Sequence, residues 1–542
     1  MPSMRSWMIR ASAFALAAAI TVPAYAQWTS DASVNTVVAD GSGDQQVPLI
    51  KPTTDGGVWV FFYDNGAGTG LKPTMQRLNP DGTRALAGNG VVLANRTNTA
   101  TFTSDIEVDA SGNVYAIFDD NSSGTNRVTV QKVEPSGNLP WGATGVQIPT
   151  MAGSFGNRIA VCADGTIVAC GAVSNVLQFQ RLNADGTFVP GETWSLAEAS
   201  RGQSPSDLIT GGNAGDVILL WVRAEGTNLV TSRKGLKIQK WDATHTPLWN
   251  GGVAVDVYTS SAAPSRGIQV AYFPQALPDG SGGAVVSWYD TGATRNAWLQ
   301  HVQGNGTQRF AQDGLAMSTV PSATELRLSA AATYLPAVDE YVVAFERSNP
   351  AQSLYGLGAQ RVTAAGSLLW GAGLDLISLT TNLHKSFINV MPAPTDDAVI
   401  TWLEYTGVNG PMLVNGMRLD DEGGFVWSPT TLGVATTEST KGRLAMSKIA
   451  GSDALIATWQ DNAAGTVDVK AQRINADGSL GTPPCPADLN NDGSVGLTDL
   501  SILLAHFGET GVTPDEGDLN GDTNVTLTDL SILLSVFGTD CP

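Results

Sequence analysis

One unit is written eight times along most of the chain, from Gln27 to about Leu480. Its clearest mark is a triplet of Gln or Met, then a basic residue, then an apolar residue, at spacings of 49 to 61 residues. The triplets begin at Gln76, Gln131, Gln180, Gln239, Gln300, Gln360, Met417 and Gln472. A fixed period of this length is typical of repeat architectures, in which each unit is one supersecondary element that stacks on its neighbours.

Each unit has the pattern of four short strands. A continuous apolar run that ends in an aromatic residue precedes the triplet, as in GAVVSW to Trp288 and AVITW to Trp402. A run that is apolar at every position indicates a strand buried on both faces. A tight turn such as Asp81-Gly82 usually follows the triplet. Eight four-stranded units of about 57 residues predict a mainly β protein, an eight-bladed β-propeller.

The two ends of the repeat region indicate how the ring closes. The last unit stops after its third strand near Ile474, while Trp28 and the run NTVVAD from Asn35 match the missing fourth strand. We therefore expect the N-terminal strand to complete the eighth blade. This places the propeller at residues 27–480, a short stiff linker at 481–484 and a separate C-terminal domain at 485–542.

Residues 1–26 have the pattern of a secretory signal peptide. Arg5 and Arg10 precede the apolar stretch Ala11–Val22, and an Ala-x-Ala site at 24–26 lies before Gln27. We predict a secreted protein, extracellular or on the cell surface. No other segment approaches the 18 apolar residues of a membrane span, so we expect no membrane insertion. After the signal the chain has 28 basic and 50 acidic residues, which argues against a nucleic-acid partner.

The last 58 residues contain a second, shorter repeat. DLNNDGSVGLTDLSILLAHFG from Asp488 and DLNGDTNVTLTDLSILLSVFG from Asp518 are identical at 15 of 21 positions. Oxygen-bearing side chains stand at loop positions 1, 3, 5, 7 and 12, the spacing of a calcium-binding loop. The predicted ligands of two Ca²⁺ ions are Asp488, Asn490, Asp492, Ser494 and Asp499 in the first copy, and Asp518, Asn520, Asp522, Asn524 and Asp529 in the second. Thr523 replaces Gly493 at the sharp turn, so we expect the second site to be strained and weaker.

An amphipathic helix is predicted after each loop. Apolar residues fall at i, i+3, i+4 and i+7 in both copies, which places them on one helix face: Leu500, Leu503, Leu504 and Phe507, then Leu530, Leu533, Leu534 and Phe537. Gly508 and Gly538 are expected to end the helices. Val495 and Val525, at position 8 of each loop, are placed to pair the two loops as a short β-bridge.

The tandem loop, the Asp at position 12 and the apolar helix together resemble a type I dockerin domain, the calcium-dependent docking module of cellulosome-type assemblies. The resemblance implies a cohesin-like partner and, often, a role in polysaccharide breakdown. It also implies that loop positions 10 and 11 help to choose the partner, which here are Leu497, Thr498, Leu527 and Thr528. The N-terminal part resembles the repeat β-propellers secreted by bacteria.

The four cysteines fit an oxidising compartment. Cys485 and Cys541 bracket the C-terminal domain, and a disulfide between them would stabilise it by about 4 kcal/mol in the loop-entropy model. Cys170 stands where other units have the aromatic residue. It is either a small core residue or the partner of Cys162 on the neighbouring strand, and the sequence leaves both alternatives open.

Acidic residues recur in the loops that follow the second strands. They are Asp64, Asp119, Asp120, Glu225, Asp290, Glu346, Glu404 and Asp461. Such a ring of carboxylates could bind a cation or supply an acid/base pair for glycoside hydrolysis. Asp also opens β-turns by accepting hydrogen bonds from its own backbone. We favour the turn interpretation because a catalytic residue should break the repeat rather than follow it.

Few residues break the repeat. His245, His301 and His384 lack metal-ligand spacing. Arg223, Arg233, Glu404 and Tyr405 are weak candidates for a sugar-binding face. No catalytic motif is present, so no catalytic residue is assigned.

The sequence thus predicts a calcium-binding docking module carrying a non-catalytic propeller that recognises a polysaccharide or surface glycan. The alternatives are a glycoside hydrolase or polysaccharide lyase, and a structural surface protein with a calcium-stabilised cap.

Overall fold

The computed structural model describes residues 28–539 except for 67–69, 95, 97–102, 121–125, 260–266, 270–271, 292–294, 321–322, 408–409, 483–484, 486 and 491–493. The predicted signal peptide, part of the predicted linker, Asp492, Gly493 and Cys541 therefore lie outside the described residues.

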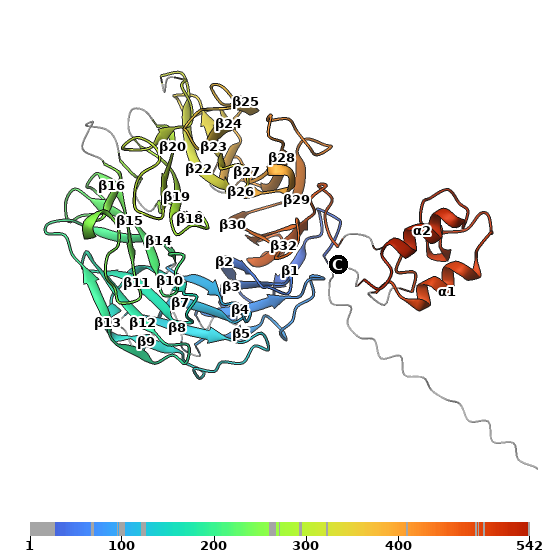
Figure 1. Ribbon diagram of the computed structural model, residues 1–542, viewed down its shortest axis with the longest axis horizontal. Coiled ribbons are helices and arrows are strands. Elements are labelled where there is room, and N and C mark those ends of the chain that lie inside the picture. The colour runs from blue at the N-terminus through green and yellow to red at the C-terminus, as the bar shows by residue number, and fades with distance from the viewer. Residues whose placement is uncertain are drawn as a thin grey trace, which may run out of the picture.

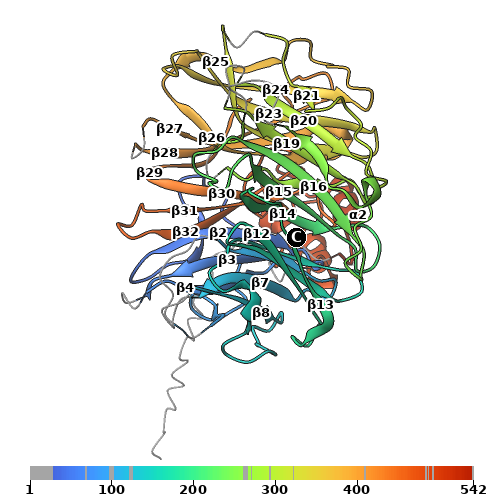
Figure 2. The ribbon, with the colours of Figure 1, turned by 90° about the vertical axis from the view of Figure 1, so that its left-hand side faces the viewer.

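Eight antiparallel sheets of four strands each stand around a common axis, like the blades of a propeller (Figure 1). The first strand of each blade lies near the axis and the last lies at the rim (Figure 1). The side view shows the blades as a thick, closed disc (Figure 2). The predicted eight-bladed β-propeller is confirmed.

The first four blades follow the chain from β2 to β17. Blade 1 contains β2 (Gln45–Pro52), β3 (Val58–Asp64), β4 (Lys72–Leu78) and β5 (Val91–Val92). Blade 2 contains β6 (Asp105–Val108), β7 (Val114–Asp120), β8 (Arg127–Val133) and β9 (Val146–Ile148). Blade 3 contains β10 (Phe155–Val161), β11 (Ile167–Val173), β12 (Val176–Leu182) and β13 (Phe188–Leu196). Blade 4 contains β14 (Gln203–Thr210), β15 (Val217–Ala224), β16 (Lys234–Trp241) and β17 (Val255–Tyr258).

The remaining blades run from β18 to β32, with β1 added to the last. Blade 5 contains β18 (Ala276–Pro278), β19 (Ala284–Tyr289), β20 (Ala297–Val302) and β21 (Leu315–Ala316). Blade 6 contains β22 (Leu326–Leu335), β23 (Glu340–Ser348), β24 (Tyr355–Thr363) and β25 (Leu374–Thr381). Blade 7 contains β26 (His384–Pro392), β27 (Ala398–Tyr405), β28 (Met412–Leu419) and β29 (Leu432–Ser439). Blade 8 contains β30 (Lys441–Lys448), β31 (Leu455–Asp461), β32 (Asp468–Ile474) and β1 (Thr36–Ala39).

Two α-helices follow the propeller, α1 (Leu497–Ala505) and α2 (Leu527–Ser535). Four single 3-10 turns complete the described helical structure, at Pro149–Met151, Asn250–Gly252, Pro394–Asp396 and Pro514–Glu516. None of the described helices is long and apolar enough to cross a membrane.

The hydrophobic core is divided among the contacts between neighbouring blades. Eight clusters of buried apolar residues each join two adjacent blades, and the second strands contribute to the clusters on both sides. In blade 1 the core residues of β3 from Val58 to Tyr63 are all fully buried. The predicted burial of these strands on both faces is confirmed, because each blade is covered by another on either side.

The glutamine of the triplet joins the third strand to the segment before the fourth. Gln239 Oε1 accepts from Trp249 N at 3.1 Å, and Gln360 Oε1 accepts from Trp370 N at 3.0 Å. Gln300 repeats the contact with the residue ten positions downstream. A buried amide needs such partners, which explains why glutamine recurs at this position.

Tryptophans fasten five of the eight blades to the turn of the next blade. The indole N–H groups of Trp28, Trp141, Trp249, Trp370 and Trp427 donate to the carbonyls of Pro80, Ala184, Gly304, Asp421 and Ala476. Each ring also lies on the glycine of that turn. Gly306 has φ of 86°, and a Cβ added to it would stand 2.6 Å from Trp249 Cβ. The turn therefore needs glycine both for its left-handed backbone and for the room it leaves.

The ring closes through the N-terminal strand, as predicted. β1 pairs antiparallel with β32, with Thr36 opposite Ala471 (Figure 1). Trp28, Val38 and Ala39 are buried in the cluster shared by blades 8 and 1. Gln472 of the last triplet completes its contacts across this junction, because Asn35 Nδ2 donates to Gln472 Oε1 at 2.9 Å.

Deleting residues 27–40 should destabilise the whole propeller, because it opens the contact between blades 8 and 1. Trp28→Ala alone should lower the free energy of unfolding by about 3–5 kcal/mol, the usual cost of truncating a buried Trp. Denaturant titration followed by circular dichroism measures both effects. Trp427→Ala, which removes the equivalent contact between blades 7 and 8, is the matched control and should cost a similar amount. A deletion that leaves the unfolding midpoint unchanged would contradict closure.

Candidate functional site

The C-terminal segment folds as two loop–helix units (Figure 1). Asp499 and Asp529, at position 12 of each loop, become the third residue of α1 and α2 and are fully buried. Asp499 Oδ2 accepts from Gly496 N at 2.7 Å, and Asp529 Oδ2 accepts from Thr526 N at 2.8 Å. Each carboxylate thereby satisfies a backbone N–H that the first turn of a helix leaves without a partner.

The second loop is held by its first residue. The carboxylate of Asp518 accepts from the backbone N–H groups of Gly521, Asp522 and Thr523 at 2.9 to 3.1 Å. Thr523 has φ of 65°, a left-handed conformation that β-branched residues rarely adopt. The strained turn expected from the Gly493-to-Thr523 difference is therefore present in the second loop.

The described loop residues have the chemistry of a calcium site. Every predicted ligand in the described part of both loops carries a carboxylate, amide or hydroxyl oxygen, and Ca²⁺ takes oxygen ligands. Burial raises the pKa of Asp529, but hydrogen bonds from Thr526 and Asn520 outweigh it and hold the pKa below its ordinary value. The carboxylate is therefore ionised, as a metal ligand must be.

Within the described residues, three acidic side chains come close enough to share one ion in an exposed turn of blade 7, formed by Asp420, Asp421 and Glu422. In the second loop the carboxylates of Asp518, Asp522 and Asp529 accept hydrogen bonds from backbone N–H groups.

The two loops do not pair with each other, so the expected bridge between Val495 and Val525 is wrong. Val495 N donates to Thr539 O at 2.9 Å, after α2, and Gly508 N donates to Val525 O at 2.8 Å, after α1. Each loop is therefore joined to the end of the other helix. This reciprocal pairing makes one compact unit of the two copies, with Leu503 and Leu533 fully buried in its core.

The predicted apolar helix faces are only partly buried. Leu504 and Leu534 are about half exposed, and Phe507 and Phe537 are exposed to a similar degree. We call the exposed apolar residues of both copies the apolar set: Leu497, Leu504, Phe507, Leu527, Leu534, Val536 and Phe537. Thr498 and Thr528, the other predicted partner-binding residues, are also exposed. On each helix one leucine, Leu503 or Leu533, is fully buried, while Leu500, Ile502 and Leu530 pack only partly against the same core.

The recurring acids of the propeller have two structural roles. Asp64 and Asp461 accept from the backbone two residues downstream, at 2.8 and 2.9 Å, as the turn interpretation predicts. Others make ion pairs or side-chain hydrogen bonds: Asp119 with Asn157, Asp120 with Arg96, Glu225 with Arg201 and Arg223, and Glu404 with Lys385. The acids thus do not form one continuous cation-binding ring.

In five of the eight triplets the second residue pairs with an acid at or near the first turn of the same blade. The pairs are Arg77 with Asp55, Lys240 with Asp216, His301 with Asp279, Arg361 with Glu340 and Arg418 with Asp397. His301 is almost fully buried, and its Nε2 lies 2.9 Å from Asp279 Oδ2. It therefore takes the place of Arg or Lys in a structural contact with the turn carboxylate.

His301 should make stability depend on pH. Burial lowers its pKa below the ordinary value of 6.5, although Asp279 opposes the shift. Below about pH 6.5 the unfolded chain takes up a proton that the folded protein does not, so stability is complete above this pH and falls below it. Replacing His301 with Gln should remove up to about 1.4 kcal/mol of this loss per pH unit. Denaturation curves of both proteins between about pH 7.5 and 5.5 measure it. Parallel pH profiles would contradict the assignment.

His245 occupies a glycine position in the turn of blade 4. Its φ is 52°, and its Nδ1 lies 3.0 Å from Glu192 Oε2 while its ring stacks on Trp194. His384 stands between the rings of Tyr355 and Tyr405, at centroid distances of 3.6 and 5.1 Å. Neither arrangement resembles a metal centre.

Cys162 and Cys170 are free thiols in the core cluster of blades 3 and 4, so the pairing alternative is wrong. Burial raises the pKa of both, which makes them poor nucleophiles. The predicted Cys485–Cys541 disulfide stays a prediction because Cys541 lies outside the described residues.

Charged side chains meet near the axis on the inner strands of blades 1 to 4. Lys51 pairs with Glu107, and Arg158 donates to the carbonyls of Ser206 and Asn157. Burial raises the pKa of Asp105 to about 7, opposed by Arg158 and Lys51. Because these groups are already partnered, the cluster holds the inner strands together rather than presenting open ligand groups.

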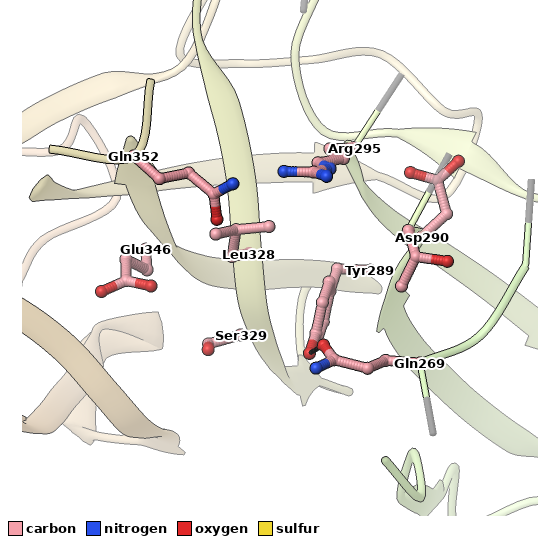
Figure 3. A pocket seen from close by; sticks show the side chains of 9 residues that line it. Gln269, Tyr289, Asp290, Arg295, Leu328, Ser329, Glu346 and Gln352 are labelled. Carbon is pink, nitrogen blue, oxygen red and sulfur yellow. Dashed lines mark hydrogen bonds between the residues drawn. The ribbon is translucent and has the colours of Figure 1, made fainter. Parts of the chain in front are cut away.

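A cavity of about 430 Å³ lies between blades 5 and 6 (Figure 3). It is lined by Gln269, Tyr289, Asp290, Thr291, Arg295, Leu328, Ser329, Glu346 and Gln352. Asp290 and Glu346 are two of the recurring acids, and Figure 3 shows them on opposite sides of the cavity. The other lining residues were not singled out by the sequence.

The cavity lies beside the shortest inner strand among the described residues. β18 has three residues, whereas β14 and β22 of the flanking blades have eight and ten. β18 pairs with Ala284 to Val286 of β19, and within the described part of the chain no strand pairs with the inner side of Tyr289. The one signal of this cavity in the sequence is the spacing of 61 residues between Gln239 and Gln300, which is the longest spacing between triplets.

The cavity walls are held by defined contacts. Tyr289 donates its hydroxyl to Gln269 Oε1, and its ring contacts Tyr272 at 4.5 Å. Burial, together with the charge of Glu346, raises the pKa of Tyr289 to about 12, so the hydroxyl keeps its proton. Glu346 Oε1 accepts from Lys385 N at 2.7 Å, which fixes that carboxylate in the wall.

A smaller cavity of about 220 Å³ lies on blade 4 beside the predicted sugar-face residue Arg223. Arg223 is already paired with Glu198 and Glu225, at 2.8 and 3.1 Å. The carbonyl of Arg233 accepts from Glu225 N in the same loop. Tyr405 and Glu404 lie instead on blade 7, so the structure does not bring the four predicted sugar-face residues together.

No protein-family model and no curated protein sequence matches the chain. Among solved structures, it is similar to a protein of unknown function from Dyadobacter fermentans at 9% identity and a TM-score of 0.37, covering 81% of this chain and 98% of that one. It is also similar to a puromycin hydrolase, at 14% identity and a TM-score of 0.41, covering 81% of this chain and 61% of that one. It is similar to the polysaccharide lyase Uly1 at 11% identity and a TM-score of 0.40, covering 82% of this chain and 92% of that one. The hydrolase and the lyase differ in activity, and at these identities and TM-scores neither activity carries over to this chain.

Proposed function

We propose that the protein is exported and acts as a calcium-dependent docking and recognition protein. Residues 485–542 form a dockerin-like module that binds two Ca²⁺ ions and a cohesin-like partner, and the propeller of residues 27–480 recognises a polysaccharide or surface glycan. The observation that carries the proposal is the duplicated loop–helix unit. Both copies place the position-12 Asp, Asp499 or Asp529, buried at the start of a short helix.

The apolar set supports a protein partner. Six of its seven members are equivalent residues of the two copies, of which Leu497 and Leu527 are 77% and 73% exposed. Clusters of exposed apolar residues mark interaction sites on folded proteins. These two leucines stand at the loop positions that choose the partner in the dockerins that this segment resembles.

The acidic charge of the module should make its stability depend on bound Ca²⁺. Its 58 residues contain ten acidic residues and no Lys or Arg, so the carboxylates repel one another without a bound cation. We propose that the disulfide between Cys485 and Cys541 ties the two ends of the module together. Both features suit a domain that works outside the cell, where calcium and oxidising conditions prevail.

Calcium should stabilise the module and bind at two sites. At a calcium concentration 100 times the dissociation constant, the expected gain is about 2.7 kcal/mol per site. Calorimetry with calcium or with EGTA measures the melting temperature, and titration measures two ions per chain. The Asp529→Ala variant should bind one Ca²⁺ ion per chain. Asp420→Ala, in the exposed acidic turn of blade 7, is the control and should leave two.

The calcium-loaded chain should also be retained by an immobilised cohesin module and released by EGTA. Melting that is insensitive to the chelator would contradict the calcium proposal. Calcium binding without cohesin retention would favour the alternative of a structural surface protein, in which the module is a stabilising cap.

A second candidate function is polysaccharide cleavage, and one observation favours it. Asp290 and Glu346 line the same cavity, and paired carboxylates are the usual catalytic groups of glycoside hydrolysis. Under this alternative, the wild-type protein should release reducing ends from a panel of plant and algal polysaccharides. Glu346→Gln should lower the rate at least about 100-fold, the scale of lost acid–base catalysis. No product across the panel would leave recognition as the function.

A further inference from the structure

We propose that the cavity between blades 5 and 6 is the ligand site of the propeller, and that it binds a neutral sugar unit of a glycan through its hydroxyl groups. This inference rests on the recognition role proposed above and gives that role a site and a ligand class. Four steps lead to it.

The cavity lies where the described inner strand is short. In blades 4 and 6 the inner strand pairs with the second strand along most of its length, whereas the described pairing of β18 with β19 ends at Val286. Blade 2 also has a short inner strand, β6, but the cavity lies at blade 5. Residues from four segments of the chain converge in the opening, from Gln269 to Gln352. Its volume of about 430 Å³ falls within the range of about 300–1,000 Å³ that small-molecule sites occupy.

The lining groups match hydroxyls. Gln269 and Gln352 carry primary amides, each of which can both donate and accept hydrogen bonds, and Thr291 and Ser329 carry hydroxyls. Sugar hydroxyls have the same double capacity, so they can satisfy any of these groups. Gln269 is already oriented by the hydroxyl of Tyr289, which occupies its Oε1 and leaves its NH₂ group to donate.

The charges of the cavity select against charged ligands. Within the described residues Arg295 makes no ion pair, and Figure 3 shows its guanidinium pointing across the cavity toward Gln352. A cationic ligand would be repelled by Arg295. An anionic ligand would lie close to the buried carboxylates of Asp290 and Glu346, which already accept from Asn296 N and Lys385 N, in a chain with a formal charge of −20. A neutral hydroxyl can accept from Arg295, and hydrogen bonds from a charged donor are the stronger ones.

The remaining lining residues offer an apolar surface. Tyr289 and Leu328 face the cavity together, and the ring of Tyr289 is fixed by its contact with Tyr272 (Figure 3). A sugar ring has an apolar C–H face as well as polar edges. Aromatic side chains combine a flat apolar surface with a polar group, which suits a ligand of this kind.

The test is calorimetric titration of the full-length mature chain with neutral and charged oligosaccharides. Cellohexaose, xylohexaose, mannohexaose and arabinohexaose are the neutral probes. Hexagalacturonate and chitosan hexamer are the anionic and cationic probes. At least one neutral probe should bind, and more tightly than either charged probe.

Two lining residues, the half-buried Arg295 and the exposed Gln352, supply the variants. Arg295→Ala should weaken binding about tenfold or more, because it removes a hydrogen bond from a charged group. Gln352→Ala should weaken it about two- to tenfold, as expected for a neutral hydrogen bond. Gln312→Ala changes an exposed glutamine in the turn between β20 and β21, outside the cavity, and should leave affinity unchanged. Circular dichroism confirms that each variant is folded.

Three results would overturn the inference: no neutral probe binds, a charged probe binds more tightly, or Arg295→Ala and Gln352→Ala bind like the wild type. Calcium titration of the same samples separates this inference from the docking proposal. Loss of calcium binding with intact sugar binding would refute only the docking module. Intact calcium binding without any sugar binding would refute only the sugar site.

Discussion

Each blade is fastened to the next by one large side chain lying on a left-handed turn residue, and the closed ring depends on this contact. At seven of the eight junctions the turn residue is a glycine, covered by Trp28, Leu86, Trp141, Trp249, Phe310, Trp370 or Trp427. At the eighth junction His245 takes the glycine position with φ of 52° and stacks on Trp194. A residue with a Cβ at such a position costs backbone strain and collides with the ring above it, so the turn and the tryptophan constrain each other. The triplet glutamine and its basic neighbour then hold the strands on either side of this contact.

The site candidates lie where this regularity is interrupted or absent. Blade 5 keeps its blade-to-blade contacts, since Trp249 still covers Gly306 and Phe310 still covers Gly366. Its described inner strand, β18, has only three residues, and the ring stays closed around it. The rigid neighbours therefore position the cavity residues, while the shortened strand gives the space. The C-terminal helices stand outside this scheme, with a small core of their own around Leu503 and Leu533.

Much of this architecture follows from local pattern. The period, the doubly buried strands and the unpaired last unit predict the number of blades and the closure by β1, because each depends on residues a few positions apart. The cavity could not be predicted in the same way, since it depends on how far β18 pairs along β19, which the local pattern does not determine. Only the longer spacing before Gln300 hints at it. In the C-terminal helices, periodicity placed Leu503 and Leu504 on one face. The structure buries the first and leaves the second exposed, because the partner helix covers only part of that face.

Ring closure by the N-terminal strand also sets an order for assembly. Residues 28–39 are the first part of the propeller to leave the ribosome, but their partners in β32 are 430 to 435 positions later in the chain. Trp28 can lie on the turn of blade 1 as soon as that blade forms, but β1 has no strand to pair with until β32 arrives. Seven blades can dock in sequence as the chain grows, and the first and last segments meet at the end. A chain of this design stays vulnerable to misassembly until synthesis of its repeat region is complete.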